Sequence, residues 1–178
     1  MDIYAQTGVM TVPTLRTERL TLRTPRLRDA RVIAKALNNI GISRWLAVVP
    51  FPYGITDAEW FIKENLHGRV HAWLAWRDDQ LIGIIGLDSE LGYWIAEDVW
   101  GYGYATEATR AVVDYHFENS DADRLKSAHF VGNDASRRVL TKLGFVDVGS
   151  HVRFSVARQE EVSGRSMLLT RAKWQAAQ

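Results

Sequence analysis

The stretch Trp100-Gly101-Tyr102-Gly103-Tyr104-Ala105-Thr106-Glu107 decides the fold, because it combines a turn, a row of backbone donors and a helix start. Residues 91–96 before it are rich in β-forming side chains, and after it apolar residues recur at helical spacing, as Ala108, Ala111, Val112 and Tyr115. The glycines at 101 and 103 allow backbone conformations in which successive N–H groups point toward one site. The helix adds unpaired N–H groups and a positive dipole end, so the stretch predicts a cradle for a phosphate or diphosphate.

The glycine spacing alone does not establish such a cradle, because a G-x-G pattern before a helix is often only a tight turn. Two familiar phosphate-binding loops are excluded. No Lys-Ser/Thr pair closes a P-loop, and Thr106 stands where the dinucleotide fingerprint has its third glycine.

The composition is that of an ordinary globular domain. The 178 residues are 47% hydrophobic and 24% charged, and the net charge of +1 does not favour nucleic acid or an anionic membrane as a partner. Without cysteine the chain has no disulfide, thiolate metal ligand or cysteine nucleophile, and we predict no metal site. The sequence shows no secretory pattern and no run of membrane-spanning length, which predicts a cytoplasmic protein. We expect a lead-in over residues 1–14 and a single domain over residues 15–178.

Hydrophobic periodicity predicts an α/β fold with a mixed sheet and helices on both faces. The expected order is β-α-α-β-β-β-α-β-α-β-β, with strands two to four antiparallel and strands four and five parallel, because a helix crosses between them. The predicted strands cover 19–23, 70–76, 81–87, 91–96, 125–131, 145–156 and 167–170. The predicted helices cover 29–37, 56–66 with a capping box from Thr56 to Glu59, the segment after the glycine loop, and 133–143.

Residues 40–53 have no clear period and carry Trp45, Phe51 and Tyr53 among glycine and proline. Aromatic side chains in an irregular segment can line a substrate pocket, but they can equally pin a loop to the core. If they line a pocket, Trp94 is expected to complete it.

The last predicted helix places Ser136 on the same face as its apolar stripe, Val139, Leu140 and Leu143. The hydroxyl would then point inward, near the carboxyl ends of the two parallel strands. The alternative is that Ser136 only satisfies the helix terminus, with Asn133 as the N-cap.

Residues 101–108 (GYGYATEA) and 133–145 (NDASRRVLTKLGF) occur in the expected order and are separated by the expected elements. Together they resemble the GNAT superfamily of acyl-CoA N-acyltransferases. Within it, TERLTLR at 17–23 and GYWI at 92–95 resemble the RimJ/RimL-type branch, which acetylates protein amino termini and diverse small amines. The resemblance extends over about residues 15–171.

This resemblance implies acetyl-CoA as cosubstrate. In the family, backbone N–H groups of the loop matching residues 100–105 hold the CoA pyrophosphate, and the pantetheine arm lies between strands four and five in place of a strand partner. Trp100 replaces the common Arg or Gln, which removes a charged contact but leaves the backbone cradle. Asn133 matches a position beside pantetheine, and Arg137 or Arg138 a position that can reach the phosphates. The implied CoA-binding residues are Trp94, Ile95, Trp100, Gly101, Tyr102, Gly103, Tyr104, Ala105, Thr106, Asn133, Arg137 and Arg138.

The implied reaction, attack of a neutral amine on a thioester, makes three demands. The carbonyl oxygen gathers negative charge, which a backbone N–H near Trp94 or Ile95 can stabilise. The departing thiolate takes a proton, and Ser136, which matches a position beside the sulfur, is the candidate acid. The amine loses a proton, and Glu90 matches a position where several family members place a carboxylate that relays it. The alternative is that Glu90 and Asp88 are solvated turn residues.

Two other classes of protein stay open at this point. The chain could keep CoA as a non-catalytic sensor or scaffold, or it could be a nucleotide- or nucleic-acid-binding α/β domain. The Asn133/Ser136 pair disfavours the first class, and the near-neutral charge and the absent third glycine disfavour the second. A monomer and a homodimer are both compatible with the sequence.

Overall fold

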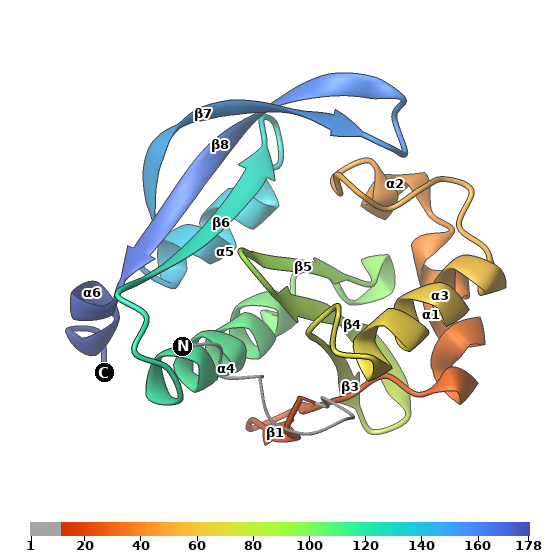
Figure 1. The fold of residues 1–178 in the computed structure, drawn as a ribbon, viewed down its shortest axis with the longest axis horizontal. Coiled ribbons are helices and arrows are strands. Elements are labelled where there is room, and N and C mark those ends of the chain that lie inside the picture. The colour runs from red at the N-terminus through yellow and green to blue at the C-terminus, as the bar shows by residue number, and fades with distance from the viewer. Residues whose placement is uncertain (1–11) are drawn as a thin grey trace.

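The computed structural model describes residues 12–178, which form one eight-stranded sheet in the order β1-β2-β3-β4-β5-β6-β8-β7 (Figure 1). The antiparallel part consists of β1 (Leu15–Arg16), β2 (Thr21–Arg23), β3 (Ala72–Arg77), β4 (Gln80–Leu87) and β5 (Leu91–Ile95). Next, β6 (Arg124–Phe130) runs parallel to β5, and the antiparallel hairpin of β7 (Val146–Ser155) and β8 (Glu160–Thr170) continues the sheet. The predicted mixed sheet is confirmed, and the two strands predicted to be parallel, the fourth and fifth, are β5 and β6.

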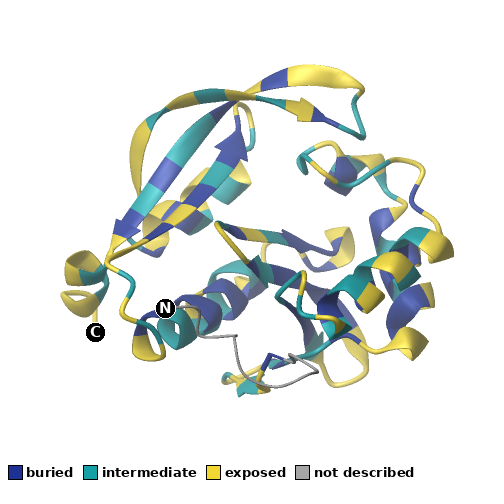
Figure 2. Cartoon of the chain, viewed as in Figure 1, coloured by how far each residue is buried: buried dark blue, intermediate teal, exposed yellow. Residues whose placement is uncertain are grey.

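Helices lie on both sides of the central strands, because those strands are apolar on both faces. In β4 all residues but Gln80 and Gly86 are buried, which requires cover above and below. On one side lie α1 (Ala30–Leu37) and α3 (Ile55–Leu66), and on the other α4 (Tyr104–Glu118) and α5 (Asp134–Lys142) (Figure 1). Figure 2 shows the buried residues concentrated on these central strands and on the helix faces turned toward them.

Several element boundaries differ from prediction. The short helix α2 (Ile40–Ser43) forms inside the segment that we expected to be irregular, capped by Asn39, which accepts the N–H of Gly41 at 2.8 Å. The predicted Thr56–Glu59 capping box is wrong. Asp57 instead accepts the N–H of Gly54 at 2.8 Å, so α3 begins one residue earlier.

The C-terminal hairpin is longer than its sequence pattern predicts. We expected the last strand to cover residues 167–170, whereas β8 begins at Glu160 and pairs with β6 on one edge and β7 on the other. Pairing on both edges holds polar residues in a strand that local propensity does not favour. The helix α6 (Arg171–Gln175) then follows, capped by the hydroxyl of Thr170.

Part of the predicted lead-in over residues 1–14 is held by the core. Val12 is buried, and the carbonyl of Pro13 accepts a hydrogen bond from the indole of Trp73 at 2.7 Å. Residues 1–11 of the predicted lead-in lie outside the described residues.

Gly83 on β4 pairs with Ile95 on β5. A Cβ at Gly83 would lie 2.1 Å from the carbonyl oxygen of Trp94, whereas a Cβ at Gly92 on the facing strand would meet no atom within 4 Å. Glycine at 83 therefore fixes how closely β5 lies against β4.

We expect Gly83→Ala to lower the free energy of unfolding by about 3 kcal/mol, because the added methyl group displaces the backbone of β5. Gly92→Ala is the matched control and should change stability by less than about 0.5 kcal/mol. Urea denaturation of the two variants measures both values. Equal stability of the two would contradict this account of β4–β5 packing.

Candidate active site

The glycine loop leaves a row of backbone donors free. After the 3-10 turn η2 (Glu97–Val99), Gly101 has φ +86° and Gly103 has φ +82°, and Gly103 is the N-cap of α4. Within residues 12–178, the N–H groups of residues 101–106 donate to no protein atom, and the next N–H, that of Glu107, bonds Gly103. The predicted conformation of the loop is therefore present, and its donors stand at the positive end of a fifteen-residue helix.

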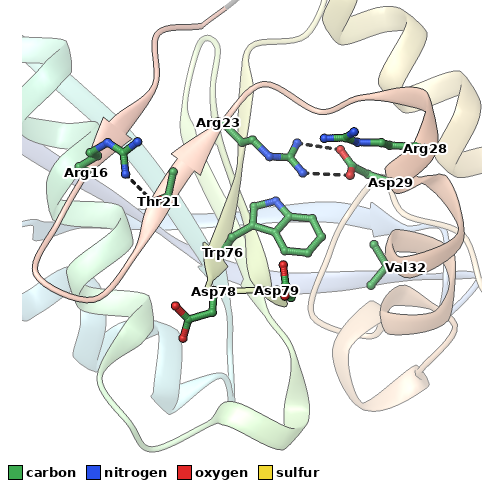
Figure 3. Close-up of a pocket in the computed structure, with 9 residues that line it drawn as sticks. All are labelled: Arg16, Thr21, Arg23, Arg28, Asp29, Val32, Trp76, Asp78 and Asp79. Carbon is green, nitrogen blue, oxygen red and sulfur yellow. Dashed lines mark hydrogen bonds and ion pairs between the residues drawn. The ribbon is translucent and has the colours of Figure 1, made fainter.

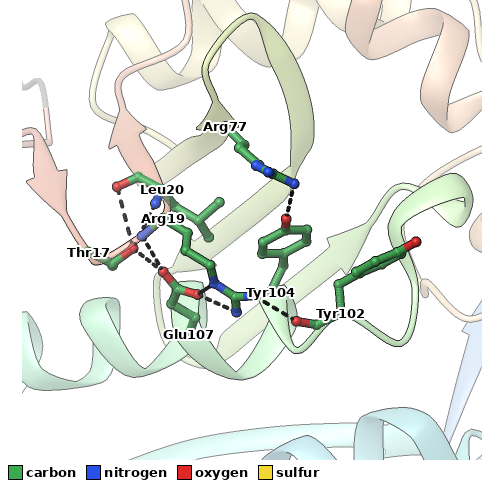
Figure 4. A network of polar contacts seen from close by, with 7 residues as sticks. All are labelled: Thr17, Arg19, Leu20, Arg77, Tyr102, Tyr104 and Glu107. Atoms are coloured by element: carbon green, nitrogen blue, oxygen red, sulfur yellow. Dashed lines mark hydrogen bonds and ion pairs between the residues drawn. The ribbon is translucent and has the colours of Figure 1, made fainter.

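Side chains from the N-terminal part of the chain hold this loop in place (Figure 4). Glu107 accepts hydrogen bonds from the hydroxyl of Thr17, from the backbone N–H of Arg19 at 2.9 Å and from its Nε at 2.7 Å. The same guanidinium donates to the carbonyl of Tyr102 at 3.0 Å and lies 4.5 Å from the ring centre of Tyr104. The sequence around Arg19 carries part of the resemblance to a family branch, but the role of Arg19 as a clamp on the loop is visible only in the structure.

Burial raises the pKa of Glu107, but the hydrogen bonds from Thr17 and Arg19 offset this and leave the pKa below its ordinary value. Glu107 is therefore a carboxylate at neutral pH. It stabilises the start of α4 and is fully engaged there, as expected for a residue that complements the helix dipole.

Trp100, which stands where the family commonly has Arg or Gln, closes the other end of the loop. Its indole N–H donates to the carbonyl of Ile95 at 2.8 Å, and nearly half of its side chain is exposed. Trp100 thus lacks the charged contact of an arginine, but its hydrogen bond connects the loop to the end of β5.

The sheet opens beside β5. Its pairing with β6 consists of the single register pair Leu91 with Ser127, to which the hydroxyl of Ser127 adds a 2.8 Å bond to the carbonyl of Leu91. Because Ala96 donates its N–H to Ile82 on β4, strand alternation directs the N–H of Ile95 away from β4, toward the opening. Of the two residues predicted as candidates for an oxyanion donor, Ile95 has its N–H directed toward the opening, whereas the N–H of Trp94 points to β4.

Ser136 lies on the inner side of α5, half-buried. Its Oγ is 2.9 Å from the hydroxyl of Tyr93, which also donates to the Ser136 carbonyl at 3.2 Å. Asn133 caps the helix by accepting the N–H of Ser136 at 3.1 Å. Both expected features are thus present. The inward hydroxyl of Ser136 contacts Tyr93, and the side chain of Asn133 is the N-cap.

Tyr93 was not among the predicted site residues, although it belongs to the GYWI motif. Burial raises the pKa of Tyr93 to about 12, with the hydrogen bond to Ser136 opposing the rise. The phenol therefore keeps its proton at neutral pH and can share it with Ser136.

Glu90 is held in an ion pair. Both of its carboxylate oxygens accept hydrogen bonds from the guanidinium of Arg153 on β7, each at 2.8 Å. These hydrogen bonds, against the opposing effect of burial, hold the pKa of Glu90 below its ordinary value. A carboxylate with a lowered pKa and two occupied oxygens is a poor proton acceptor, so the geometry disfavours the expected relay role.

The two arginines that follow Ser136 are exposed, as a contact with phosphates requires. Arg137 forms a 3.2 Å ion pair with Asp134 one turn earlier, and Arg138 extends from the adjoining position of α5.

The three aromatic residues predicted for the acceptor pocket lie in different environments. Trp45 is half-buried, and a Cβ at Gly132 would lie 3.7 Å from its ring, so the indole covers the turn between β6 and α5. Phe51 is exposed, whereas Tyr53 is buried and burial raises its pKa. Tyr53 thus packs the loop onto the core, and Trp45 and Phe51 remain available to a ligand.

A separate cavity of about 540 Å³ lies at the other side of the sheet, between β2, β3 and α1 (Figure 3). Its wall is formed by the fork of Arg23 on Asp29, at 2.8 and 3.0 Å, and by Trp76 beneath the guanidinium. It lies on β2 and β3, apart from the opening beside β5.

No helix within residues 12–178 is both long and apolar enough to span a membrane. In the same part of the chain, no three His, Asp or Glu side chains converge on a point where a metal could bind.

A parallel pair that opens beside a helix-capping donor loop, with a hydroxyl on the following helix, is the architecture of a CoA-dependent acyltransferase. Comparison with known proteins agrees. The profile of the Acetyltransferase (GNAT) domain family matches residues 19–146. The chain is 31% identical over 149 residues to "Putative ribosomal N-acetyltransferase YdaF" of Bacillus subtilis, covering 74% of this chain and 80% of that protein. It is also 31% identical over 150 residues to "Uncharacterized N-acetyltransferase YoaA" of the same organism, covering 77% and 85% of the two chains.

Solved structures share the fold. One described as a probable acetyltransferase superposes with a TM-score of 0.81 at 26% identity, over 91% of this chain and 99% of that one. RimJ of Mycobacterium smegmatis, in complex with CoA-disulfide, superposes with a TM-score of 0.74 at 23% identity, over 91% and 88% of the two chains. The protein belongs to the GNAT family of acetyltransferases, in its RimJ/RimL-like branch, and is an acetyl-CoA-dependent acyltransferase.

The clamp on the glycine loop makes a pH-dependent contribution to stability. Since the pKa of Glu107 is lowered by folding, its contribution is present above the unfolded value of about 4.3 and is lost as the pH falls through the folded value. We expect Glu107→Gln to destabilise the protein by about 1.5 kcal/mol at pH 7. The difference from wild type should shrink as the pH falls below about 5 and passes through the lowered pKa of Glu107.

Thermal unfolding across this pH range measures the difference. Glu160→Gln, which breaks an exposed ion pair with Arg158, is the control and should cost less than about 0.5 kcal/mol. A loss in Glu107→Gln that does not vary with pH would contradict the electrostatic origin of the clamp.

Proposed function

We propose that this acetyltransferase moves the acetyl group of acetyl-CoA to the α-amine at a protein amino terminus. Acetyl transfer to an amine follows from the family. The acceptor class is supported by one observation in the site: Glu90, the predicted base, is neutralised by Arg153. The name of the YdaF relative, a ribosomal N-acetyltransferase, points to the same class of acceptor.

The acid–base chemistry connects that observation to the acceptor. An α-amine with a pKa near 8 is roughly a tenth neutral at pH 7, whereas a lysine-type amine with a pKa near 10.4 is neutral to less than about one part in a thousand. A site whose carboxylate is engaged in an ion pair gives little help in removing a proton. It therefore suits an acceptor that is already partly neutral.

For CoA, we assign the diphosphate to the free N–H groups of residues 101–106 and the pantetheine arm to the opening between β5 and β6. The fit rests on donors that no atom of residues 12–178 accepts and on a strand edge left unpaired beyond Leu91. Asn133 would border the pantetheine, and Arg137 and Arg138 are exposed on the side where phosphates would lie. Trp45 and Phe51 would flank the acceptor.

In the reaction, CoA supplies an acyl thioester whose carbonyl carbon is attacked by the amine nitrogen. We assign the N–H of Ile95 to the carbonyl oxygen, where loss of such a donor typically costs about 3 kcal/mol. As the C–S bond breaks, Ser136 gives its hydroxyl proton to the sulfur and takes the proton of the Tyr93 phenol, which is 2.9 Å away. The amine releases its surplus proton to water, and water returns one proton to Tyr93.

Acetyl-CoA, CoA and pantetheine should be compared by calorimetry, and thiol release should be measured with a panel of amines. We expect CoA to bind far more tightly than pantetheine, because only CoA carries the diphosphate. Peptides with a free amino terminus should be acetylated in preference to amino-terminally blocked peptides that contain lysine, and to polyamines. No heat with any CoA species would overturn the placement of CoA, and preference for polyamines would overturn the acceptor class.

We expect Ser136→Ala to lower kcat about a hundredfold while leaving the dissociation constant of CoA unchanged, since the variant loses the proton donor and no phosphate contact. Thr141→Ala is a matched control, because it removes an exposed hydroxyl from the same helix. That hydroxyl bonds only the carbonyl of Arg137. Steady-state kinetics and calorimetry together test both variants. An unchanged kcat in Ser136→Ala would remove Ser136 from the mechanism.

A further inference from the structure

The two halves of the sheet have very little backbone pairing between them. Seven register pairs join β6 to β8 and nine join β7 to β8, but one pair, Leu91 with Ser127, joins β5 to β6. The part of β5 beyond that pair carries Tyr93 and Ile95. Its position relative to β6 and α5 therefore depends on other contacts.

One such contact is the ion pair of Glu90 with Arg153. Glu90 adjoins Leu91 at the point where the sheet opens, whereas Arg153 lies on β7, which is separated from β6 by β8. Figure 1 shows the β7–β8 hairpin arching over the open side of the sheet, and the ion pair joins that hairpin to the start of β5. The fork on both carboxylate oxygens fixes the direction as well as the distance of this contact.

The pair is only partly exposed, with 32% of the Glu90 side chain and 40% of the Arg153 side chain accessible. His151, two residues before Arg153, and Lys126 on β6 also act electrostatically on Glu90. Three basic side chains thus act on Glu90, and Arg153 is the one that bonds it directly.

We propose that Arg153 and Glu90 form a positioning strap that sets the width of the opening between β5 and β6, and with it the placement of the acyl group. The strap rests on the proposed function, because the opening matters to catalysis only if the pantetheine arm lies there. Glu90 acts through β5, on which Ile95 and Tyr93 follow within five residues. Neither Glu90 nor Arg153 accepts a proton in this arrangement.

The test uses Glu90→Gln, Arg153→Gln, the double variant and the charge-reversed pair Glu90→Arg/Arg153→Glu. We expect each single variant to lower kcat/KM about tenfold, because a small misplacement of reacting groups is enough for such a loss. The double variant should be no worse than either single one, since both changes break the same contact. The reversed pair should recover most of the activity.

Arg165→Gln is the matched control. It breaks a forked ion pair with Asp147 of similar exposure on the same hairpin, at 2.6 and 2.7 Å, but that pair does not cross the opening. Its kcat/KM should stay within about twofold of wild type. Arg153→Lys, which keeps the charge but loses the fork, should be intermediate if Arg153→Gln fails to fold.

A pH–rate profile separates the strap from a base. If Glu90 were the base, Arg153→Gln would free it and shift the acidic limb to higher pH, and Glu90→Gln would abolish that limb. With a strap, the profiles of both variants keep the wild-type shape at lower amplitude. A shifted limb, or Arg153→Gln as active as Arg165→Gln, would overturn the strap while leaving the proposed acetyl transfer intact. A wild-type protein that releases thiol with no amine would instead overturn the proposed function.

Discussion

The structure depends on an interruption of strand pairing. Hydrogen bonding between β5 and β6 stops after Leu91, although both strands continue, and the N–H of Ile95 is left without a strand partner. Unpaired backbone donors inside a protein are costly unless a ligand or water satisfies them. The interruption therefore separates the strands where a ligand can pair, and it makes every contact that spans the opening important for geometry.

Contacts distant in sequence hold the parts of the site together. The glycine loop is clamped from the N-terminal side by Thr17 and Arg19 through Glu107, and Ser136 is oriented from the neighbouring strand by Tyr93. In each case a side chain outside the motif completes it. The loop and the helix motif can therefore be recognised in the sequence, but neither forms a complete site without side chains from other segments.

Glu90 shows the difference between the type of a residue and its role. A carboxylate at this position is compatible with a proton relay, and nothing near it in sequence argues otherwise. Its partner Arg153 lies 63 residues later, in a hairpin whose first strand curves back over the opening. An ion pair of this kind makes Glu90 a poor proton acceptor, and it is the contact on which the proposed strap and the proposed class of acceptor both rest.

The sequence by itself determined the mixed sheet, the parallel strands now labelled β5 and β6, the glycine loop at the start of α4 and the inward Ser136, because periodicity and glycine spacing act locally. Tertiary structure decided the rest. Pairing on both edges of β8 extended that strand. Strand alternation left the N–H of Ile95, and not that of Trp94, without a strand partner. Packing of the loop placed Tyr53 in the core instead of in a pocket. Each of these outcomes depends on which distant segments meet, and local propensity carries no information about that.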